Sequence, residues 1–405
     1  MREYILMKKI CIAACLFLMV SCSVSRNETV DNDMEVKRLI RYEDALKGDM
    51  KYSTLFDSLS IVPLDTTGGY MIGEVKQIKI SAHYIAVLDR NSNVFVYNHE
   101  GEGAALISRK GQGEKEYIDV RGIDILTDSL VCLLTYPPKL MYFKMDGTFH
   151  SEVPLKNRAF ELAVLPDGKA VLYKNNIDDG TMNMSLLEIY NPSDDSYKGY
   201  VPGIRFMENQ PIPHFQQFGT LTMTQRNGLL FTHSLTNNIY GIDNKGVHIK
   251  YRIDFGDRNP SFHYPKKLPE EKSVTDYLIE NFPVCGFNSC WENSSYLHWG
   301  GYLSGKSVTF LYDKEADRLY SDFNMQEDFT GLTPSPIMAS DDCLAVYFTT
   351  GNVEALMDYL EYSGKQVENQ PLLDRMATFV REAGNPIVGF YHFKRNLQFS
   401  KDDKI

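Results

Sequence analysis

The sequence predicts an all-β fold built from repeated small sheets. The stretch from Asp119 to Leu155 reads as four short strands in succession, GIDIL, LVCLL, LMYFK and FHSEV, separated by turns. Asp146-Gly147 between two of these strands is a strong hairpin signal, because glycine accepts a positive φ at no steric cost. Four antiparallel strands in so short a stretch cannot bury both faces, so the sheet needs copies of itself as neighbours.

Such copies recur along the chain. Six stretches are typical of the second strand of a sheet, and each is followed by a partner strand. They are Tyr84–Asp89, Leu130–Thr135, Lys169–Lys174, Gly228–His233, Tyr296–Gly301 and Cys343–Phe348. Their starts lie roughly 40–70 residues apart, the spacing of propeller blades that carry loop insertions, and no helix recurs between them as in a solenoid. The repeat predicts a β-propeller and by itself leaves five, six or seven blades open.

Two more strands are predicted at the ends of the repeat. Asp57–Thr66 precedes the first unit, and Asn385–Arg395 follows the last one. Pairing the two strands would close the ring through one long-range contact, whose cost in loop entropy grows only slowly with loop length. We therefore expect the two strands to pair with each other.

Three segments interrupt the β pattern as predicted helices: Pro269–Phe282, Val353–Tyr362 and Pro371–Ala383. Asn352 is the expected N-cap of the second helix, and Gly384 follows the third. The first helix is expected in the connection between the fourth and fifth blades, and the other two inside the sixth. Their apolar stripes are expected to pack on the propeller.

The N-terminus reads as a targeting signal. Met7-Lys8-Lys9 precedes the apolar run ICIAACLFLMV and then Ser21-Cys22, and this run is too short to span a bilayer as a permanent helix. The pattern resembles a bacterial lipoprotein signal with Cys22 as the lipidated residue; the alternative is an ordinary cleaved signal peptide. We expect residues 1–21 to be the signal, 22–52 a polar tether, 53–398 the propeller and 399–405 a C-terminal tail.

Three stretches carry a family resemblance: SLSIVPLDTTGGYMIGEVKQIKIS, YIAVLDRNSNVFVYNHEGE and RKGQGEKEYIDVRGIDI. They resemble the six-bladed β-propeller lipoproteins of gut Bacteroidetes, most strongly from Ser58 to Pro154. The resemblance implies six four-stranded blades in an NHL/TolB-like ring at the cell envelope. It implies no defined reaction, because propellers host unrelated functions. Lys115 stands where that family usually has glycine, so this loop is expected to differ in shape.

Several function classes are disfavoured. A formal net charge of −11 without a basic stripe argues against nucleic acid as a partner. None of the nine histidines forms an HExxH or HxH pair, and no GxSxG elbow occurs, so we predict no metal, no cofactor and no catalytic residues. Gly111-Gln112-Gly113 is followed by a strand rather than a helix, and we interpret it as a connection between blades rather than a phosphate loop.

Candidate ligand-binding residues come from two patterns. Long aromatic and polar insertions near the fourth and fifth blades, Pro211–Phe218 and the stretch between the two tryptophans, are expected at one rim, although their aromatic rings could instead pack on the blades. Arg121, Arg158 and Gln217 lie near the starts of predicted innermost strands. The ligand-binding candidates are Arg121, Arg158, His214, Gln217, Trp291 and Trp299.

Two cysteines, Cys285 and Cys290, lie close together in the sequence FPVCGFNSCWEN. Outside the cytoplasm they could form a disulfide, which would require the chain to turn back sharply between them.

The favoured hypothesis is a lipid-anchored envelope propeller that binds a glycan, a peptide or an envelope protein and catalyses no reaction. Its anchor would be a bacterial membrane, in the first place the outer membrane, with the body in the periplasm or at the surface. The alternative is an envelope hydrolase or lyase that acts on glycan or peptide at the channel mouth; a structural scaffold is a third reading. Two carboxylates about 5–10 Å apart at the mouth would indicate hydrolysis, whereas aromatic, amide and arginine side chains would indicate binding.

Overall fold

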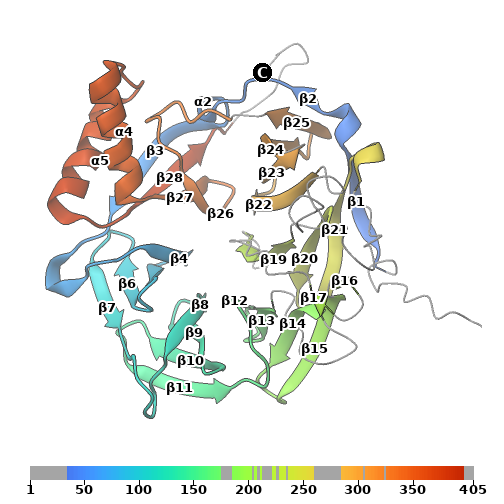
Figure 1. The fold of residues 1–405 in the computed structure, drawn as a ribbon, viewed down its shortest axis with the longest axis vertical. Coiled ribbons are helices and arrows are strands. Elements are labelled where there is room, and N and C mark those ends of the chain that lie inside the picture. The colour runs from blue at the N-terminus through green and yellow to red at the C-terminus, as the bar shows by residue number, and fades with distance from the viewer. Residues whose placement is uncertain are drawn as a thin grey trace, which may run out of the picture. The chain divides into compact units, whose positions relative to one another are not determined.

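Six small sheets form a ring, and one edge strand of each sheet lies nearest the centre (Figure 1). The computed structural model describes residues 34–174, 185–202, 205–207, 210–211, 221–224, 228–233, 236–259, 284–303, 306–322 and 325–395. The fold is the predicted six-bladed β-propeller, and its blades are numbered here in chain order. The innermost strands are β4 (Val75–Ile80), β8 (Asp119–Leu126), β12 (Glu161–Val164), β18 (Leu221–Met223), β22 (Val284–Glu292) and β26 (Ser335–Ala339).

The middle strands of each blade are those that the repeat predicts. The second strands are β5 (Tyr84–Asp89), β9 (Leu130–Tyr136), β13 (Ala170–Tyr173), β19 (Leu229–Thr232), β23 (Tyr296–Leu303) and β27 (Cys343–Phe348). The third strands are β6 (Val94–Asn98), β10 (Lys139–Lys144), β14 (Ser185–Asn191), β20 (Asn238–Asp243), β24 (Lys306–Asp313) and β28 (Ile387–Phe393). These strands are buried on both faces because each blade packs between two others, so they read as nearly continuous apolar runs.

The fourth strand of blade 6 has a different origin from that of the other five blades. Blades 1–5 end in β7 (Gly103–Ile107), β11 (Phe149–Pro154), β15 (Ser196–Pro202), β21 (Gly246–Asp254) and β25 (Arg318–Asp322). Blade 6 takes its outer strand, β3 (Phe56–Pro63), from the N-terminal part of the chain. The remaining short elements are the strand pair β16 (Arg205–Met207) and β17 (Gln210–Pro211), the helix α2 (Tyr52–Leu55), and 3-10 turns at Tyr42–Asp44, Thr67–Gly69 and Gly256–Arg258.

Part of the predicted tether belongs to the propeller, so the boundaries 22–52 and 53–398 need correction. Strand β1 (Val36–Arg41) pairs parallel with β21 as a fifth strand of blade 4, and β2 (Leu46–Lys47) pairs parallel with β25 of blade 5. A strand at the outer edge leaves most of its side chains in solvent; in β1 only Ile40 is buried, at 3% exposure. Its polar composition therefore looks like that of a linker.

The ring closes as the sequence predicts. Strand β3 pairs antiparallel with β28, from Ile387 opposite Pro63 to Phe393 opposite Phe56. Beside this seam Asn385 is fully buried; its Nδ2 donates to the carbonyl oxygens of Leu64 (3.2 Å) and Tyr70 (2.7 Å), and its Oδ1 accepts from the Ile72 N–H (2.9 Å). One side chain thus ties the last blade to the chain that leads into the first.

Two helices lie between β27 and β28, as predicted: α4 (Thr350–Ser363) and α5 (Gln370–Ala383). The N-cap of α4 is Thr349 rather than Asn352, because the Thr349 hydroxyl accepts from the Asn352 N–H at 3.2 Å. Buried residues of α5, including Leu373 and Met376, share one core cluster with strands of blade 6. The helix predicted at Pro269–Phe282 lies outside the described residues. In the described part of the chain, no helix is both long and apolar enough to cross a bilayer.

The glycine-rich stretch around Gly113 connects β7 to β8, in agreement with its interpretation as an inter-blade turn. The Gly113 N–H donates to the Glu116 carboxylate at 2.8 Å. Lys115, the residue that departs from the Bacteroidetes pattern, has a φ of 59°, a left-handed conformation that glycine adopts more easily.

Candidate functional site

A cavity of about 670 Å³ lies on the axis of the ring, and all six innermost strands contribute to its lining. Strands whose inner edge faces the axis direct alternate side chains toward their neighbours and toward the cavity. The lining residues are Lys76, Gln77, Ile78, Lys79, Arg90, Arg121, Phe160, Glu161, Tyr173, Leu221, Thr222, Ser289, Cys290, Thr333, Pro334, Ser335, Pro336, Ile337 and Tyr347. This cavity is the candidate functional site.

The innermost strands present backbone N–H groups that have no partner within their own sheet, since each is an edge strand. Side chains of the preceding blade accept from three of them. Gln77 accepts from the Ile123 N–H at 2.8 Å, and Asp124 from the Val164 N–H at 2.7 Å.

Glu161 continues this pattern by accepting from the Leu221 N–H at 3.1 Å. Asp124 and Glu161 thus both help to hold adjacent blades together. Burial raises the pKa of the Asp124 carboxyl, and the nearby Lys79 ammonium opposes that rise.

Three cations gather where β4 and β8 begin. The Arg121 Nε lies 2.9 Å from an Asp119 carboxylate oxygen, and the Arg90 Nε lies 2.5 Å from a Glu74 oxygen. Lys76 donates to the Val120 carbonyl at 2.6 Å. Burial, with the charges of Arg121 and Arg90, lowers the pKa of Lys76 against the opposing effect of Asp119, so the three positive groups are close enough to influence one another.

The lining is cationic although the protein is acidic. It contains four basic residues, Lys76, Lys79, Arg90 and Arg121, and one acidic residue, Glu161, in a chain of formal net charge −11. Aromatic and hydroxyl side chains form much of the rest. Arg121 also lies over the Phe160 ring, with its Cζ 5.8 Å from the ring centroid. Such a lining is suited to bind an anionic group beside an apolar surface.

The structure separates the predicted site residues. Arg121 lines the cavity. Arg158 is exposed between β11 and β12, where its guanidinium lies 5.4 Å from the centroid of the Tyr136 ring, and it does not line the cavity. His214 and Gln217 lie outside the described residues, as does most of the predicted loop Pro211–Phe218.

Both tryptophans pack in the core of blade 5 instead of presenting a ring at the surface. Trp291 is 2% exposed and stacks on His298 at a centroid distance of 4.8 Å. Trp299 is fully buried and stacks on Phe310 at 4.9 Å. Packing on the blade, the alternative considered from the sequence, accounts for the described contacts of both rings.

Cys290 is a buried free thiol that lines the cavity, so the possible bridge with Cys285 is not formed. Both positions lie on the single strand β22, where five residues of extended chain separate two Cα atoms by far more than a disulfide allows. The side chain of Cys285 lies outside the described residues. Burial raises the pKa of the Cys290 thiol, so the thiolate, its reactive form, is disfavoured.

Sequence reasoning missed Lys76 and Arg90. Lys76 satisfies the criterion that selected Arg121, a charged residue near the start of an innermost strand. Arg90 lies just after β5, on a turn between strands, and only the folded blade brings it to the axis. Among the residues that the structure describes, no group of His, Cys, Asp or Glu is placed to hold a metal ion.

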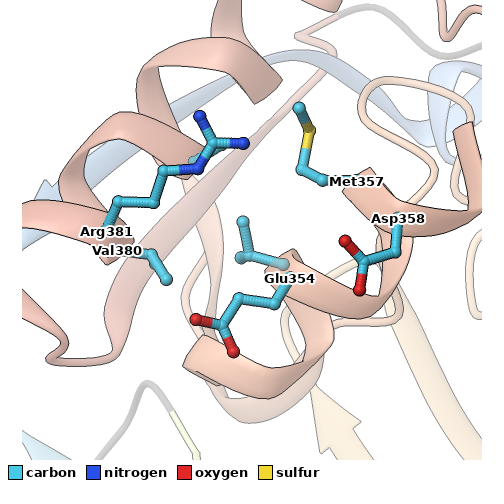
Figure 2. A pocket seen from close by; sticks show the side chains of 7 residues that line it. Glu354, Met357, Asp358, Val380 and Arg381 are labelled. Atoms are coloured by element: carbon cyan, nitrogen blue, oxygen red, sulfur yellow. The ribbon is translucent and has the colours of Figure 1, made fainter. Parts of the chain in front are cut away.

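A second hollow of about 260 Å³ lies between α4 and α5 (Figure 2). Glu354, Met357 and Asp358 border it from α4, and Val380 and Arg381 from α5. It is smaller than the axial cavity and is built by one helical hairpin. Two carboxylates one turn apart on a helix are a common surface arrangement, so this hollow is not the candidate site.

A ring of six small sheets around an axial cavity defines the protein as a six-bladed β-propeller. The model of the domain of unknown function DUF4934 matches residues 39–392, and the chain belongs to this family.

One solved structure supports the fold. A Bacteroides fragilis protein described as exported, BF0058, superposes with a TM-score of 0.67 at 18% identity, over 88% of this chain and 100% of that chain. A streptogramin B lyase is similar at a TM-score of 0.39 and 13% identity, over 74% of this chain and 82% of its own. YCF48 bound to D1 peptide is similar at 0.40 and 9%, over 73% and 81%. The last two are too distant to support any argument, and no curated protein sequence matches the chain.

Proposed function

We propose that this protein is a cell-envelope β-propeller that binds a ligand in its axial cavity and catalyses no reaction. The observation that carries the proposal is the composition of the cavity lining. Hydrolysis of glycosidic bonds by general acid–base chemistry generally needs two carboxylates that face the substrate. The described lining has one, Glu161, and that carboxylate already accepts from the Leu221 N–H.

The lining instead combines two arginines, two lysines, one amide and three aromatic side chains with hydroxyl and apolar residues, as in a site built for recognition. One competing function, an envelope glycoside hydrolase, would require a second carboxylate that moves to the axis. Asp124 is the nearest candidate by position, but it is 4% exposed and its oxygens accept from Val164 and Ile125. This engagement favours binding over catalysis.

A cavity-blocking variant tests the proposal in the mature full-length protein. Ser335 lines the cavity at the start of β26, so Ser335→Trp should fill it, whereas Thr378→Trp adds the same ring on the exposed side of α5. Envelope-derived glycan and peptide fragments would be screened by thermal shift. A bound ligand should raise the Tm of the wild type and of Thr378→Trp by a few degrees, but not that of Ser335→Trp. Turnover of any fragment, detected by mass spectrometry, would contradict a purely binding role.

The envelope location rests on the Ser21-Cys22 signal, and the description of the Bacteroides fragilis relative as exported is consistent with it. We propose that Cys22 carries the lipid, that the outer membrane holds it, and that the chain is an NHL/TolB-like propeller lipoprotein. Cys22→Ala should abolish labelling by a radioactive fatty acid and release the protein from the membrane fraction. Retention of the variant in the membrane would argue against lipidation.

A further inference from the structure

We infer that the ligand of the axial cavity is a carboxylate-bearing sugar of the uronic acid type, whose carboxylate binds at Arg121, Arg90 and Lys76. This inference rests on the proposed function and names the class of ligand that the same site takes. Three features of the lining carry it: how the two guanidinium groups are held, how much charge remains unpaired, and what forms the rest of the wall.

The two guanidinium groups are held through one edge each. Asp119 contacts the Nε of Arg121, and Ser92 fixes Asp119 in turn by donating to its other oxygen at 2.7 Å. Glu74 contacts the Nε of Arg90. In the described structure these are the ion pairs of the two arginines, which leaves their terminal amino groups as donors. A guanidinium that is already oriented loses less side-chain entropy when a carboxylate binds to it in a bidentate manner.

The unpaired charge at the mouth matches a single negative charge. The four basic lining residues supply four positive charges, and Glu161, Glu74 and Asp119 offset three of them, which leaves one. A carboxylate carries one negative charge, whereas a phosphate monoester carries about −1.5 to −2 near neutral pH. Phosphate would therefore stand uncompensated beside Asp119, and a carboxylate would not.

The rest of the wall is suited to a sugar ring. Phe160 and Tyr347, both half-buried, offer aromatic carbon on which the C–H face of a pyranose can lie, and Ser335 offers a hydroxyl group. The described cavity is large enough for a small saccharide, at about 670 Å³.

An acidic peptide is a poorer match to this wall. Extended peptides commonly bind by adding a strand to an open sheet edge. Here backbone N–H groups at the inner edges of β8, β12 and β18 are already bonded to Gln77, Asp124 and Glu161, so those edges offer a peptide fewer partners. The inner edges of blades 2, 3 and 4 thus already have side-chain partners for these N–H groups.

Calorimetric titration of the mature protein with four probes tests the inference: digalacturonate, its methyl ester, neutral digalactose and triglutamate. Digalacturonate should bind the wild type, and the methyl ester and digalactose should bind at least about tenfold more weakly, because they lack the charge that the arginines recognise. Arg121→Gln should weaken digalacturonate by about 10–100-fold. Arg158→Gln, which removes an exposed arginine outside the cavity, should leave the affinity unchanged. Arg121 is partly exposed, and an unaltered melting curve of its variant would confirm that the fold persists.

The other outcomes overturn the inference in distinguishable ways. Equal affinity for the acid and its ester would exclude carboxylate recognition, and tighter binding of triglutamate would exclude a sugar. Both results would leave the proposed function standing, since a ligand would still occupy the cavity and Ser335→Trp would still block it. If the wild type bound none of the four probes, the inference would be wrong, and the fragment screen with Ser335→Trp would decide the proposed function separately.

Discussion

The two halves of the ring are built differently. Blades 1–3 consist of consecutive strands, β4–β7, β8–β11 and β12–β15, whereas each of blades 4–6 receives an N-terminal strand, β1, β2 or β3. Val36 thus pairs with Ile249, and Pro63 with Ile387. The first half forms from local contacts, while the second depends on pairings that span most of the chain and carry a larger entropic cost. The N-terminal segment is therefore structural in one half of the ring and absent from the other.

The two halves of the ring contribute different kinds of side chain to the candidate site. Its cations, Lys76, Arg90 and Arg121, come from blades 1 and 2 and from the turns beside them. Blades 4–6 supply hydroxyl and apolar residues such as Thr222, Ser335 and Ile337. The charged wall thus stands on the locally built half, and the second half completes the enclosure. Changes that loosen blades 4–6 should open the cavity without removing its charge.

Removal of β28, which pairs with β3 to close the ring, should have the largest effect on stability. A chain that ends at Gly384 lacks β28, which leaves β27 and β3 without their shared partner. Its unfolding should lose the single cooperative transition, because no contact then closes the ring. Calorimetry and urea unfolding followed by circular dichroism would measure this. A chain that ends at Arg395 keeps β28 and is the control; an unchanged melt of the shorter chain would contradict the closure argument.

Asn385→Ala should be the most damaging single substitution at the seam. It removes a fully buried amide that bonds to Leu64, Tyr70 and Ile72, and it leaves those backbone groups without partners. We expect the free energy of unfolding to fall by about 3–4 kcal/mol.

The matched control for Asn385→Ala is Asn157→Ala in the locally built half. Asn157 is half-buried and donates to Glu188 at 3.2 Å, so its loss should cost about 1 kcal/mol or less. If urea unfolding showed equal losses of unfolding free energy for the two variants, the contacts at the seam would contribute no more to stability than those within a blade.

Acid should weaken the two halves unequally. His233 in blade 4 and His298 in blade 5 are buried, and burial lowers the pKa of each to about 4 from an ordinary 6.5. Between these pH values the unfolded chain binds more protons at both histidines than the folded chain does, so the free energy of unfolding falls as the pH drops. The loss at pH 4 should be about 2–3 kcal/mol per histidine.

Hydrogen exchange resolved by blade would test the acid effect, with protection expected to fall first in blades 4 and 5. His298→Gln should flatten the pH profile of stability, and His150→Gln, at an exposed position of blade 2, should not change it. Uniform loss of protection around the ring would show that the acid response is not located in these blades.

The smallest expected effect distinguishes the two faces of the added strand β1. Ile40 is 3% exposed and packs in a core cluster with Ile253, whereas its neighbour Leu39 is 46% exposed. Ile40→Ala should destabilise the protein by about 2 kcal/mol, since an edge strand can partly relax into the space left. Leu39→Ala should change stability by about 0.5 kcal/mol or less. Equal effects in urea unfolding would mean that β1 contributes no core contact.

The sequence alone predicted those strands whose pattern of apolar residues matches their burial in the fold. The middle strands of all six blades are apolar on both faces, so stretches such as Tyr84–Asp89 and Cys343–Phe348 match β5 and β27 in full. The pairing of β3 with β28 followed because a ring of incomplete sheets needs a closing strand. The capping residues at their ends predicted the helices α4 and α5. The N-cap of α4, however, is Thr349 and not the predicted Asn352.

Tertiary structure decided what depends on which neighbour a residue meets. An outer strand exposes most of its side chains, so β1 and β2 look like linker in the sequence, and only pairing with β21 and β25 identifies them. The local sequence around a tryptophan does not reveal whether its ring is buried or exposed. Only the packing of the folded blades shows that Trp291 and Trp299 lie in the core. The cation cluster joins residues from separate strands and turns. The cluster forms when blades 1 and 2 fold and pack together, and no single strand of the chain contains it.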